Sequence, residues 1–156
     1  MSVSHILAII VRYGLVMLFL PFSALDKTIG FEGAVKQSQE LFKVRGAAIF
    51  VLMCGLGIEV VMSLGVVAGV ADRMAALIMA AYCATTAVLF KRFWAQGDFW
   101  ARGDSRGRNL FWDFLKNLSL GAGFLLIVIG TNGSGLQPFL AHPLASSHPY
   151  STTEVR

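Results

Sequence analysis

Four long apolar blocks constrain this sequence more than any other feature. They run from about Ile6 to Leu25, Ala47 to Val70, Met74 to Phe90 and Leu110 to Gly130. An apolar helix of roughly 17 to 25 residues crosses about 30 Å of hydrocarbon. The whole chain is also apolar, with 56% hydrophobic residues and a mean hydropathy of +0.67. The sequence therefore predicts an all-α, polytopic membrane protein, with a bundle of four transmembrane helices in residues 1–130.

The segments outside the blocks differ in pattern. Between the first two blocks, Phe31, Val35 and Phe42 recur among polar residues with helical spacing. This pattern predicts a short amphipathic helix between helices 1 and 2; an ordinary solvated connector is the alternative. Residues 131–156 are rich in Pro, Ser, Gly and His and lack periodicity, which predicts a flexible polar tail.

The distribution of basic residues bears on function and topology. The net charge of +4 comes mainly from two connections, 26–45 and 91–109, and forms no continuous stripe, so nucleic-acid binding is not expected. The positive-inside rule places both connections in the cytoplasm and both termini outside. Arg12 interrupts the first block, and no A-x-A site follows Phe22, so we interpret this block as a retained helix of a multi-pass protein and not as a signal peptide.

Two charged residues lie deep inside the blocks. Arg12 precedes Leu25 by 13 positions and Glu59 follows Ala47 by 12, so both lie about 20 Å from the same membrane side. Because buried charges usually pair, we predict an Arg12–Glu59 ion pair or a shared water cavity. The alternative is that the pair only fixes the register of the helices.

A second polar group is predicted nearer the membrane surface. Asp113, Lys116 and Asn117 share one face of the fourth helix, and Asp26 and Lys27 end the first helix on the same membrane side. These five residues would form a pocket for an amphiphile with a polar head, such as a quinone or a lipid. The alternative for Lys116 is that its long side chain simply reaches the headgroups.

Several kinds of site are not expected from the sequence. The three histidines lie outside the blocks, so haem held within the bundle by histidine is excluded, and no metal-ligand spacing occurs. Cys54 and Cys83 form no CxxC motif. No covalently bound cofactor is expected, and no constellation of nucleophile and base indicates catalysis.

The chain resembles the DoxX family of small four-helix membrane proteins over roughly Arg12 to Gly130. The resemblance is carried by Arg12-Tyr-Gly-Leu15, Leu25-Asp-Lys27, Gly57-Ile-Glu59, Ala71-Asp-Arg-Met-Ala-Ala-Leu77 and Phe114-Leu-Lys-Asn-Leu-Ser-Leu-Gly121. It implies a four-helix bundle in a bacterial inner membrane. Members of the family include a subunit associated with thiosulfate:quinone oxidoreductase or a terminal quinol oxidase, and others resemble partners of systems that handle thiol and oxidative stress.

The leading hypothesis is therefore a redox-linked membrane subunit that contacts quinone or a partner oxidoreductase through the pocket of Asp26, Lys27, Asp113, Lys116 and Asn117. The alternative is a non-enzymatic membrane anchor or scaffold that holds a soluble partner through Arg102, Arg106 and Arg108 in the basic connections. A transporter is disfavoured, because the sequence shows no repeat or broken helix. Membrane lipid is an expected partner, and the sequence is compatible with a homo-oligomer.

Overall fold

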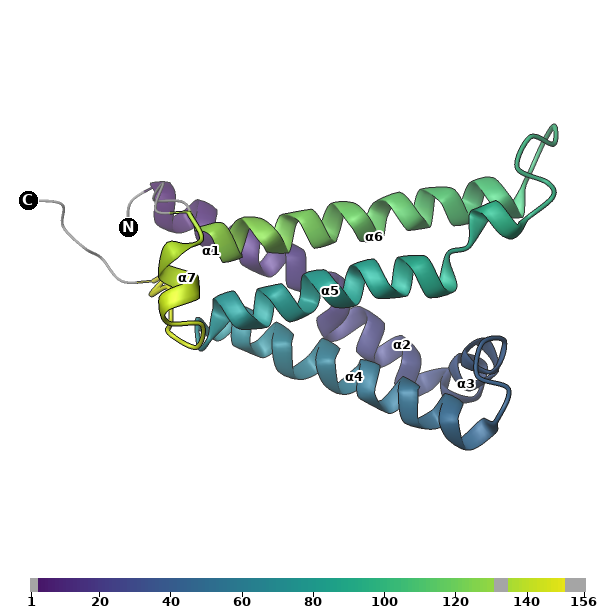
Figure 1. Cartoon of the computed structure of the whole chain (residues 1–156), viewed down its shortest axis with the longest axis horizontal. Helices are drawn as coiled ribbons and strands as arrows, with labels where there is room; N and C mark the ends of the chain where they lie inside the picture. Colours follow the sequence, from purple (N-terminus) through teal and green to yellow (C-terminus); the bar gives the residue numbers. More distant parts are fainter. Residues whose placement is uncertain (1–2, 131–134, 151–156) are drawn as a thin grey trace, which may run out of the picture.

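The computed structural model describes residues 3–130 and 135–150. Within these ranges the chain is helical and contains no strand (Figure 1). The elements are α1 (Val3–Met17), the π-helix η1 (Leu18–Ser23), α2 (Ala24–Ile29), α3 (Phe31–Gln39), α4 (Arg45–Ala68), α5 (Asp72–Phe90), the 3₁₀ turn η2 (Phe93–Ala95), α6 (Arg106–Ile129) and α7 (Gln137–Ala141).

Four helical segments are long and apolar enough to cross a membrane, which confirms the predicted fold class. They are His5–Ile29, Arg45–Ala68, Asp72–Ala95 and Arg106–Ile129, with 24 or 25 residues each. A helix satisfies its own backbone hydrogen bonds, so it can cross hydrocarbon, which offers no hydrogen-bonding partners. The chain is a multi-pass membrane protein.

The first of these segments is not one regular helix. It passes from α1 through η1 into α2, and Leu20 inside η1 has extended dihedral angles (φ −124°, ψ 109°). Pro21 follows directly; it has no N–H to donate to the helix, and its ring restricts the preceding residue. We attribute the break to this proline. The helical path nevertheless continues to Ile29, four residues beyond the expected end at Leu25.

The connection between the first two spans contains the predicted amphipathic helix, α3. Val35 is fully buried, and Phe31 and Phe42 pack around it against Ala48 and Leu52 of α4. The polar residues of α3, such as Glu32 and Lys36, are exposed. The prediction of an amphipathic helix is confirmed, and the helix folds back over the bundle.

The core of the bundle lies between α1, α4, α5 and α6. Its buried side chains include Phe19, Val66, Met79, Cys83 and Phe124. Helices α5 and α6 pack side by side along most of their length, whereas α1 contacts α6 only through a short stretch (Figure 1).

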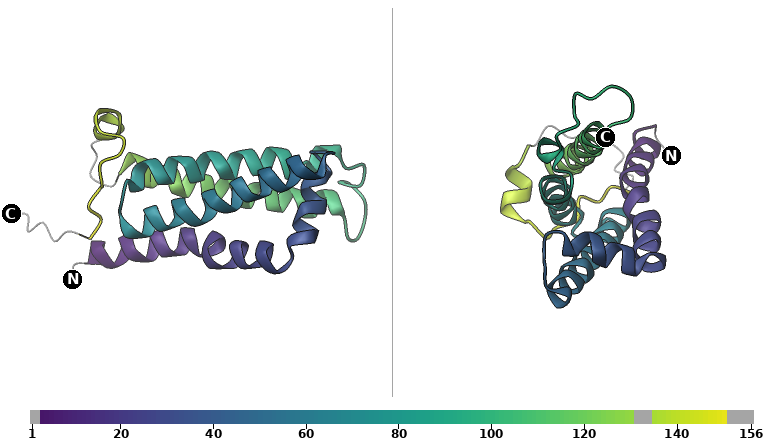
Figure 2. Two further views of the ribbon diagram at one scale, coloured as in Figure 1. Left: turned by 90° about the horizontal axis from the view of Figure 1, so that it is seen from below. Right: turned by 90° about the vertical axis from the view of Figure 1, so that its right-hand side faces the viewer.

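The two ends of the bundle differ. The α3 segment and the α5–α6 connection lie at one end, and the chain's beginning and α7 lie at the other (Figures 1 and 2). At the latter end, the Ser146 hydroxyl donates to the Gly69 carbonyl and the Tyr150 hydroxyl to the Val67 carbonyl. Residues 135–150, predicted as part of a flexible tail, are thus packed against the α4–α5 turn in their last part. The tail residues 131–134 and 151–156 lie outside the described ranges.

Candidate functional site

Arg12 forms a buried cluster with the start of α5 and the C-terminal segment. Its Nη2 donates to Asp72 Oδ2 (2.6 Å) and to Ser147 Oγ (3.0 Å), and its Nη1 donates to the Val66 carbonyl (2.7 Å). Asp72 is completely buried and also accepts hydrogen bonds from the backbone N–H (2.9 Å) and the hydroxyl of Ser147. Its position in the first turn of α5 further favours a negative charge. This cluster is internally satisfied, which is typical of a structural element.

A second cluster surrounds Glu59 and is not satisfied. Glu59 Oε1 accepts hydrogen bonds from the Lys27 ammonium and from the Tyr82 hydroxyl (2.7 Å). Lys27 also donates to Ser23 Oγ (2.9 Å). Glu59 Oε2 and Ser63 Oγ are buried and have no hydrogen-bond partner in the part of the chain that the structure describes. We call Ser23, Lys27, Glu59, Ser63 and Tyr82 the Glu59 cluster.

The Glu59 cluster draws its residues from three spans. Ser23 and Lys27 come from the first span, on either side of the η1–α2 junction, and are one helical turn apart. Glu59 and Ser63 are one helical turn apart on α4, and Tyr82 comes from α5. The side chain of Glu59 is 2% exposed and that of Lys27 is 23% exposed, so the lysine lies on the open side of the cluster.

The predicted Arg12–Glu59 ion pair is wrong, because each residue pairs with a different partner. Both are buried, as expected, but Arg12 binds Asp72 and Glu59 binds Lys27. The depth estimate took Leu25 as the membrane edge, whereas the helix continues to Ile29, so Arg12 lies deeper than that estimate. It reaches the carbonyl of Val66, which is about 10 Å beyond Glu59 along α4.

The predicted pocket between the first and fourth helices is also not formed. Asp113 instead makes ion pairs with Lys91 and Lys116, both at 3.3 Å, and Asn117 donates to Thr86 of α5. The Lys116 side chain is 72% exposed, which agrees with the alternative that it reaches toward the headgroups. Asp26 is exposed, and Lys27 alone of the five residues joins the Glu59 cluster.

The arrangement of the helices explains why these five residues remain apart. Helix α6 packs mainly on α5, and it meets the first span near the middle, where the rings of Phe19 and Phe124 lie 5.9 Å apart. At Gly123 of α6, the Leu15 side chain fills the position that a Cβ would take. The ends of the two helices therefore do not face each other across a shared pocket.

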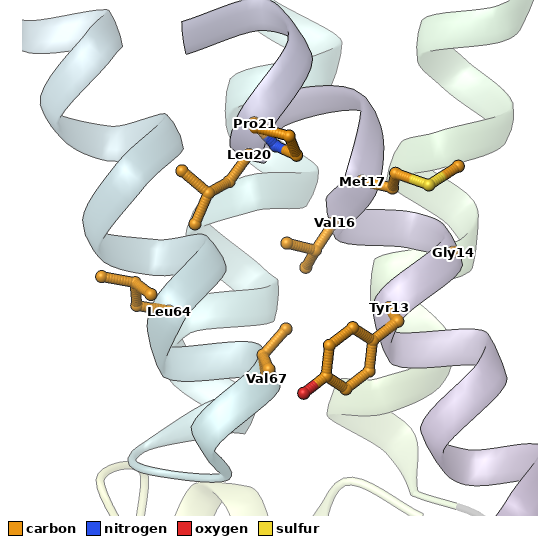
Figure 3. A pocket seen from close by; sticks show the side chains of 8 residues that line it. All are labelled: Tyr13, Gly14, Val16, Met17, Leu20, Pro21, Leu64 and Val67. Atoms are coloured by element: carbon orange, nitrogen blue, oxygen red, sulfur yellow. The ribbon is translucent and has the colours of Figure 1, made fainter. Parts of the chain in front are cut away.

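A groove of about 420 Å³ lies between the first span and α4 (Figure 3). It is lined by Tyr13, Gly14, Val16, Met17, Leu20, Pro21, Leu64 and Val67. The Tyr13 hydroxyl is the one side-chain polar group among these residues (Figure 3). Pro21 is two positions from Ser23, and Leu64 directly follows Ser63, so the groove and the cluster are neighbours along both helices.

Five residues of the two buried clusters were missed by the sequence interpretation; they are Ser23, Ser63, Asp72, Tyr82 and Ser147. Ser63 could have been found, because it lies one turn from Glu59 on the same face. Tyr82 lies in the third apolar block, and nothing in the sequence shows that its hydroxyl faces α4. Asp72 lies between the second and third blocks, and its pairing with Arg12 was not predicted.

The described residues contain no group of three or more His, Cys, Asp and Glu side chains that could hold a metal ion. Cys54 and Cys83 are both free thiols. The Glu59 cluster with the adjoining groove is therefore the candidate functional site. Comparison of the chain with family models, with curated proteins and with solved structures finds no match.

Proposed function

We propose that this chain is a DoxX-like, quinone-binding subunit of a bacterial inner membrane that works with a partner oxidoreductase. In this proposal the Glu59 cluster holds the quinone head, and the groove beside it holds the apolar tail. The site differs from the pocket expected from the sequence, but it keeps Lys27 and adds Glu59. The resemblance of the chain to DoxX proteins, which Lys27 and Glu59 help to carry, also supports the proposal.

The observation that carries the proposal is the unpartnered Oε2 of Glu59 beside the ammonium of Lys27. A buried carboxylate oxygen needs a hydrogen-bond donor. An ammonium group has three N–H donors, and Lys27 uses two of them, on Ser23 and Glu59. The site therefore offers a free acceptor on Glu59 and a free donor on Lys27, beside the unpartnered Ser63 hydroxyl, which matches a head group whose oxygens are carbonyls in the quinone and hydroxyls in the quinol.

The groove supports the proposal from the apolar side. Its lining is almost entirely aliphatic or aromatic, and it lies between two spans, where an isoprenoid tail would remain in the hydrocarbon layer. The polar head of such a ligand would thus contact the Glu59 cluster, and its long apolar tail would contact the groove.

A bound quinone would take up two electrons and two protons on reduction to the quinol, with the electrons coming from the partner oxidoreductase. In the proposed site, Lys27 donates a hydrogen bond to a carbonyl oxygen of the head. Glu59 Oε2 would accept a hydrogen bond from a hydroxyl of the quinol that this reduction forms. Tyr82 holds Glu59 Oε1 in place, so that Oε2 remains directed away from that bond.

Quinone content per protein after gentle purification from native membranes tests this proposal. We expect Glu59→Gln and Lys27→Met each to lower the copurified quinone at least fivefold. The first variant removes the free acceptor of the site, and the second removes the free donor. Lys116→Met is the matched control; it removes an exposed lysine near the same membrane side and should leave the quinone content within about twofold.

A loss of folding is separated from a loss of binding by the thermal transition of each purified variant. Ser63→Ala adds a further control, since it removes a buried hydroxyl that has no partner among the described residues and should leave the fold intact. If folded Glu59→Gln and Lys27→Met proteins retain as much quinone as the Lys116→Met protein, the proposal is wrong.

A further inference from the structure

The α5–α6 connection, which we define as residues 91–112 and which therefore runs into the first turns of α6, presents three tryptophans on a compact set of phenylalanine rings. Phe93, Phe99 and Phe111 contact one another, with ring centroids 5.0–5.9 Å apart. Each phenylalanine also contacts the tryptophan that follows it, at 4.8–5.7 Å; these are Trp94, Trp100 and Trp112. The tryptophans are 54%, 89% and 58% exposed, respectively, so the inner rings support an outer layer of indoles.

The backbone of this connection is fixed by its acidic residues. The Asp98 carboxylate accepts hydrogen bonds from the backbone N–H groups of Arg106 (2.7 Å) and Gly107 (3.0 Å) at the start of α6. Desolvation raises the pKa of Asp98, but these backbone hydrogen bonds outweigh it and hold the pKa below the ordinary value. Asp104 accepts from the Ser105 N–H (2.9 Å) and from Asn109 (3.1 Å). Both carboxylates thus serve the fold of the connection itself.

Three arginines in the same region are not used by the fold. Arg108 donates to the carbonyls of Phe99, Ala101 and Gly103. In contrast, Arg92, Arg102 and Arg106 are exposed, and their side chains make no hydrogen bond or ion pair within residues 3–130 and 135–150. Residues 91–109 carry five basic and two acidic side chains, so the exposed charge of the connection is positive.

We propose that the α5–α6 connection binds the anionic phospholipids of the adjoining leaflet. Its arginines would contact lipid phosphates and its indoles would lie at headgroup level. The connection lies between the ends of two membrane spans, at the end of the bundle opposite α7, as Figures 1 and 2 show. Indoles favour this depth because they are apolar with one N–H donor, and guanidinium groups match phosphate geometry.

A lipid surface explains the combination of these features better than an acidic protein does. A protein interface buries its aromatic anchors in fitted pockets. Here the three indoles are spread over a connection that already has its own aromatic support. The free arginines lie between and beside the indoles in the chain. Such a mixture suits the membrane interface, where lipid phosphates lie directly above the apolar layer. This proposal does not depend on quinone binding.

Fluorescence quenching by brominated phospholipids tests the position of the indoles. The full-length protein is placed in neutral bilayers that contain a minority of brominated lipid, either phosphatidylglycerol or phosphatidylcholine. We expect brominated phosphatidylglycerol to quench at least twofold more than brominated phosphatidylcholine, because anionic lipid would gather around the connection. In Trp100→Phe, which changes the most exposed indole, this excess quenching should fall by about one third or more.

Charge variants test the role of the arginines in the same assay. Arg102→Gln/Arg106→Gln should reduce the excess quenching by phosphatidylglycerol at least twofold. Lys36→Gln/Lys43→Gln removes the same charge from exposed residues at the same end of the bundle. This variant should leave the excess quenching unchanged. Equal quenching by the two lipids, or an equal effect of both double variants, would overturn the proposal. Absence of Trp100 quenching by either lipid would also overturn it and would favour an acidic protein partner.

Discussion

Arg12 joins three segments of the chain that are far apart in the sequence. Its guanidinium group contacts the Val66 carbonyl near the end of α4, Asp72 at the start of α5 and Ser147 in the C-terminal segment. Arginine suits this position because its planar group offers several donors in fixed directions. The Arg12 and Asp72 side chains are 8% and 0% exposed, so neither charge has bulk water as an alternative partner.

We predict that Arg12→Gln lowers the free energy of unfolding by about 3 kcal/mol, because it leaves the Asp72 carboxylate buried without its counter-charge. Equilibrium unfolding in mixed micelles measures this loss. Arg92→Gln is the control, since Arg92 is exposed, and it should change the free energy by less than about 0.5 kcal/mol. Similar values for the two variants would contradict the buried pair.

At the scale of residues, the sequence predicted burial better than pairing. Arg12 and Glu59 were expected inside the bundle because lipid does not accept unpaired charges. The partners of Arg12 and Glu59 depend on where each helix ends and on which face it turns toward its neighbours. The spacing of residues along one helix predicts neither of these two properties. A continuation of four residues past Leu25 was enough to separate Arg12 from Glu59 and to bring Lys27 to it.

Helices α4 and α5 form a hairpin whose closeness depends on small side chains. A Cβ at Gly65 would lie 3.1 Å from the Ala75 Cβ and 3.2 Å from the Val70 carbonyl oxygen. Gly69 then ends α4 in the left-handed conformation (φ 71°), which glycine adopts without strain. Gly65 therefore lets the two consecutive helices approach closely, whereas Gly69 ends α4.

We predict that Gly65→Leu destabilises the protein by about 2 kcal/mol, because a large side chain would push α5 away from α4. Gly57→Leu is a matched control on the same helix, since no heavy atom lies within 4 Å of a Cβ there. Thermal unfolding in detergent measures both changes. The close contact at Gly65 would be unimportant if both leucine variants unfolded at the same temperature.

The elements themselves were largely predictable. The four spans follow from length and hydropathy, and α3 follows from the helical spacing of Phe31 and Val35. The geometry of the break at Leu20 could not be predicted. Pro21 indicates that the helix is interrupted, but it does not indicate how the chain returns to a helix afterwards. Periodicity likewise could not indicate that the segment near Ser147 packs on the bundle.

The molecule is closed at one end by its own C-terminal segment. Ser147 covers Asp72, Ser146 binds the Gly69 carbonyl, and Pro149 contacts Gly69. These contacts join residues of the α4–α5 turn to a segment more than 70 positions later in the chain. At the opposite end α3 packs on α4 through Val35, and the polar groups there belong to α3 and the α5–α6 connection.

We predict that deletion of the chain from Ser146 onward lowers the free energy of unfolding by about 2 kcal/mol, because Asp72 loses both hydrogen bonds from Ser147. Unfolding curves of the deletion, of Arg12→Gln and of the combined variant provide the test. The combined loss should differ from the sum of the single losses by more than about 0.5 kcal/mol, because Arg12 and Ser147 both bind Asp72. Additive losses would show that the segment contributes elsewhere.

The pairing of the buried charges has an electrical consequence. Two cations of the bundle each lie beside a buried anion, Arg12 with Asp72 and Lys27 with Glu59, so each pair is neutral as a unit. A voltage across the membrane acts on net charge, at about 2.3 kcal/mol per elementary charge moved through 100 mV. The resting voltage of an energised cell would therefore exert little net force on the interior of this bundle. Removal of one member of either pair would leave a single charge within the field, and the folded state would then depend on whether the membrane is energised.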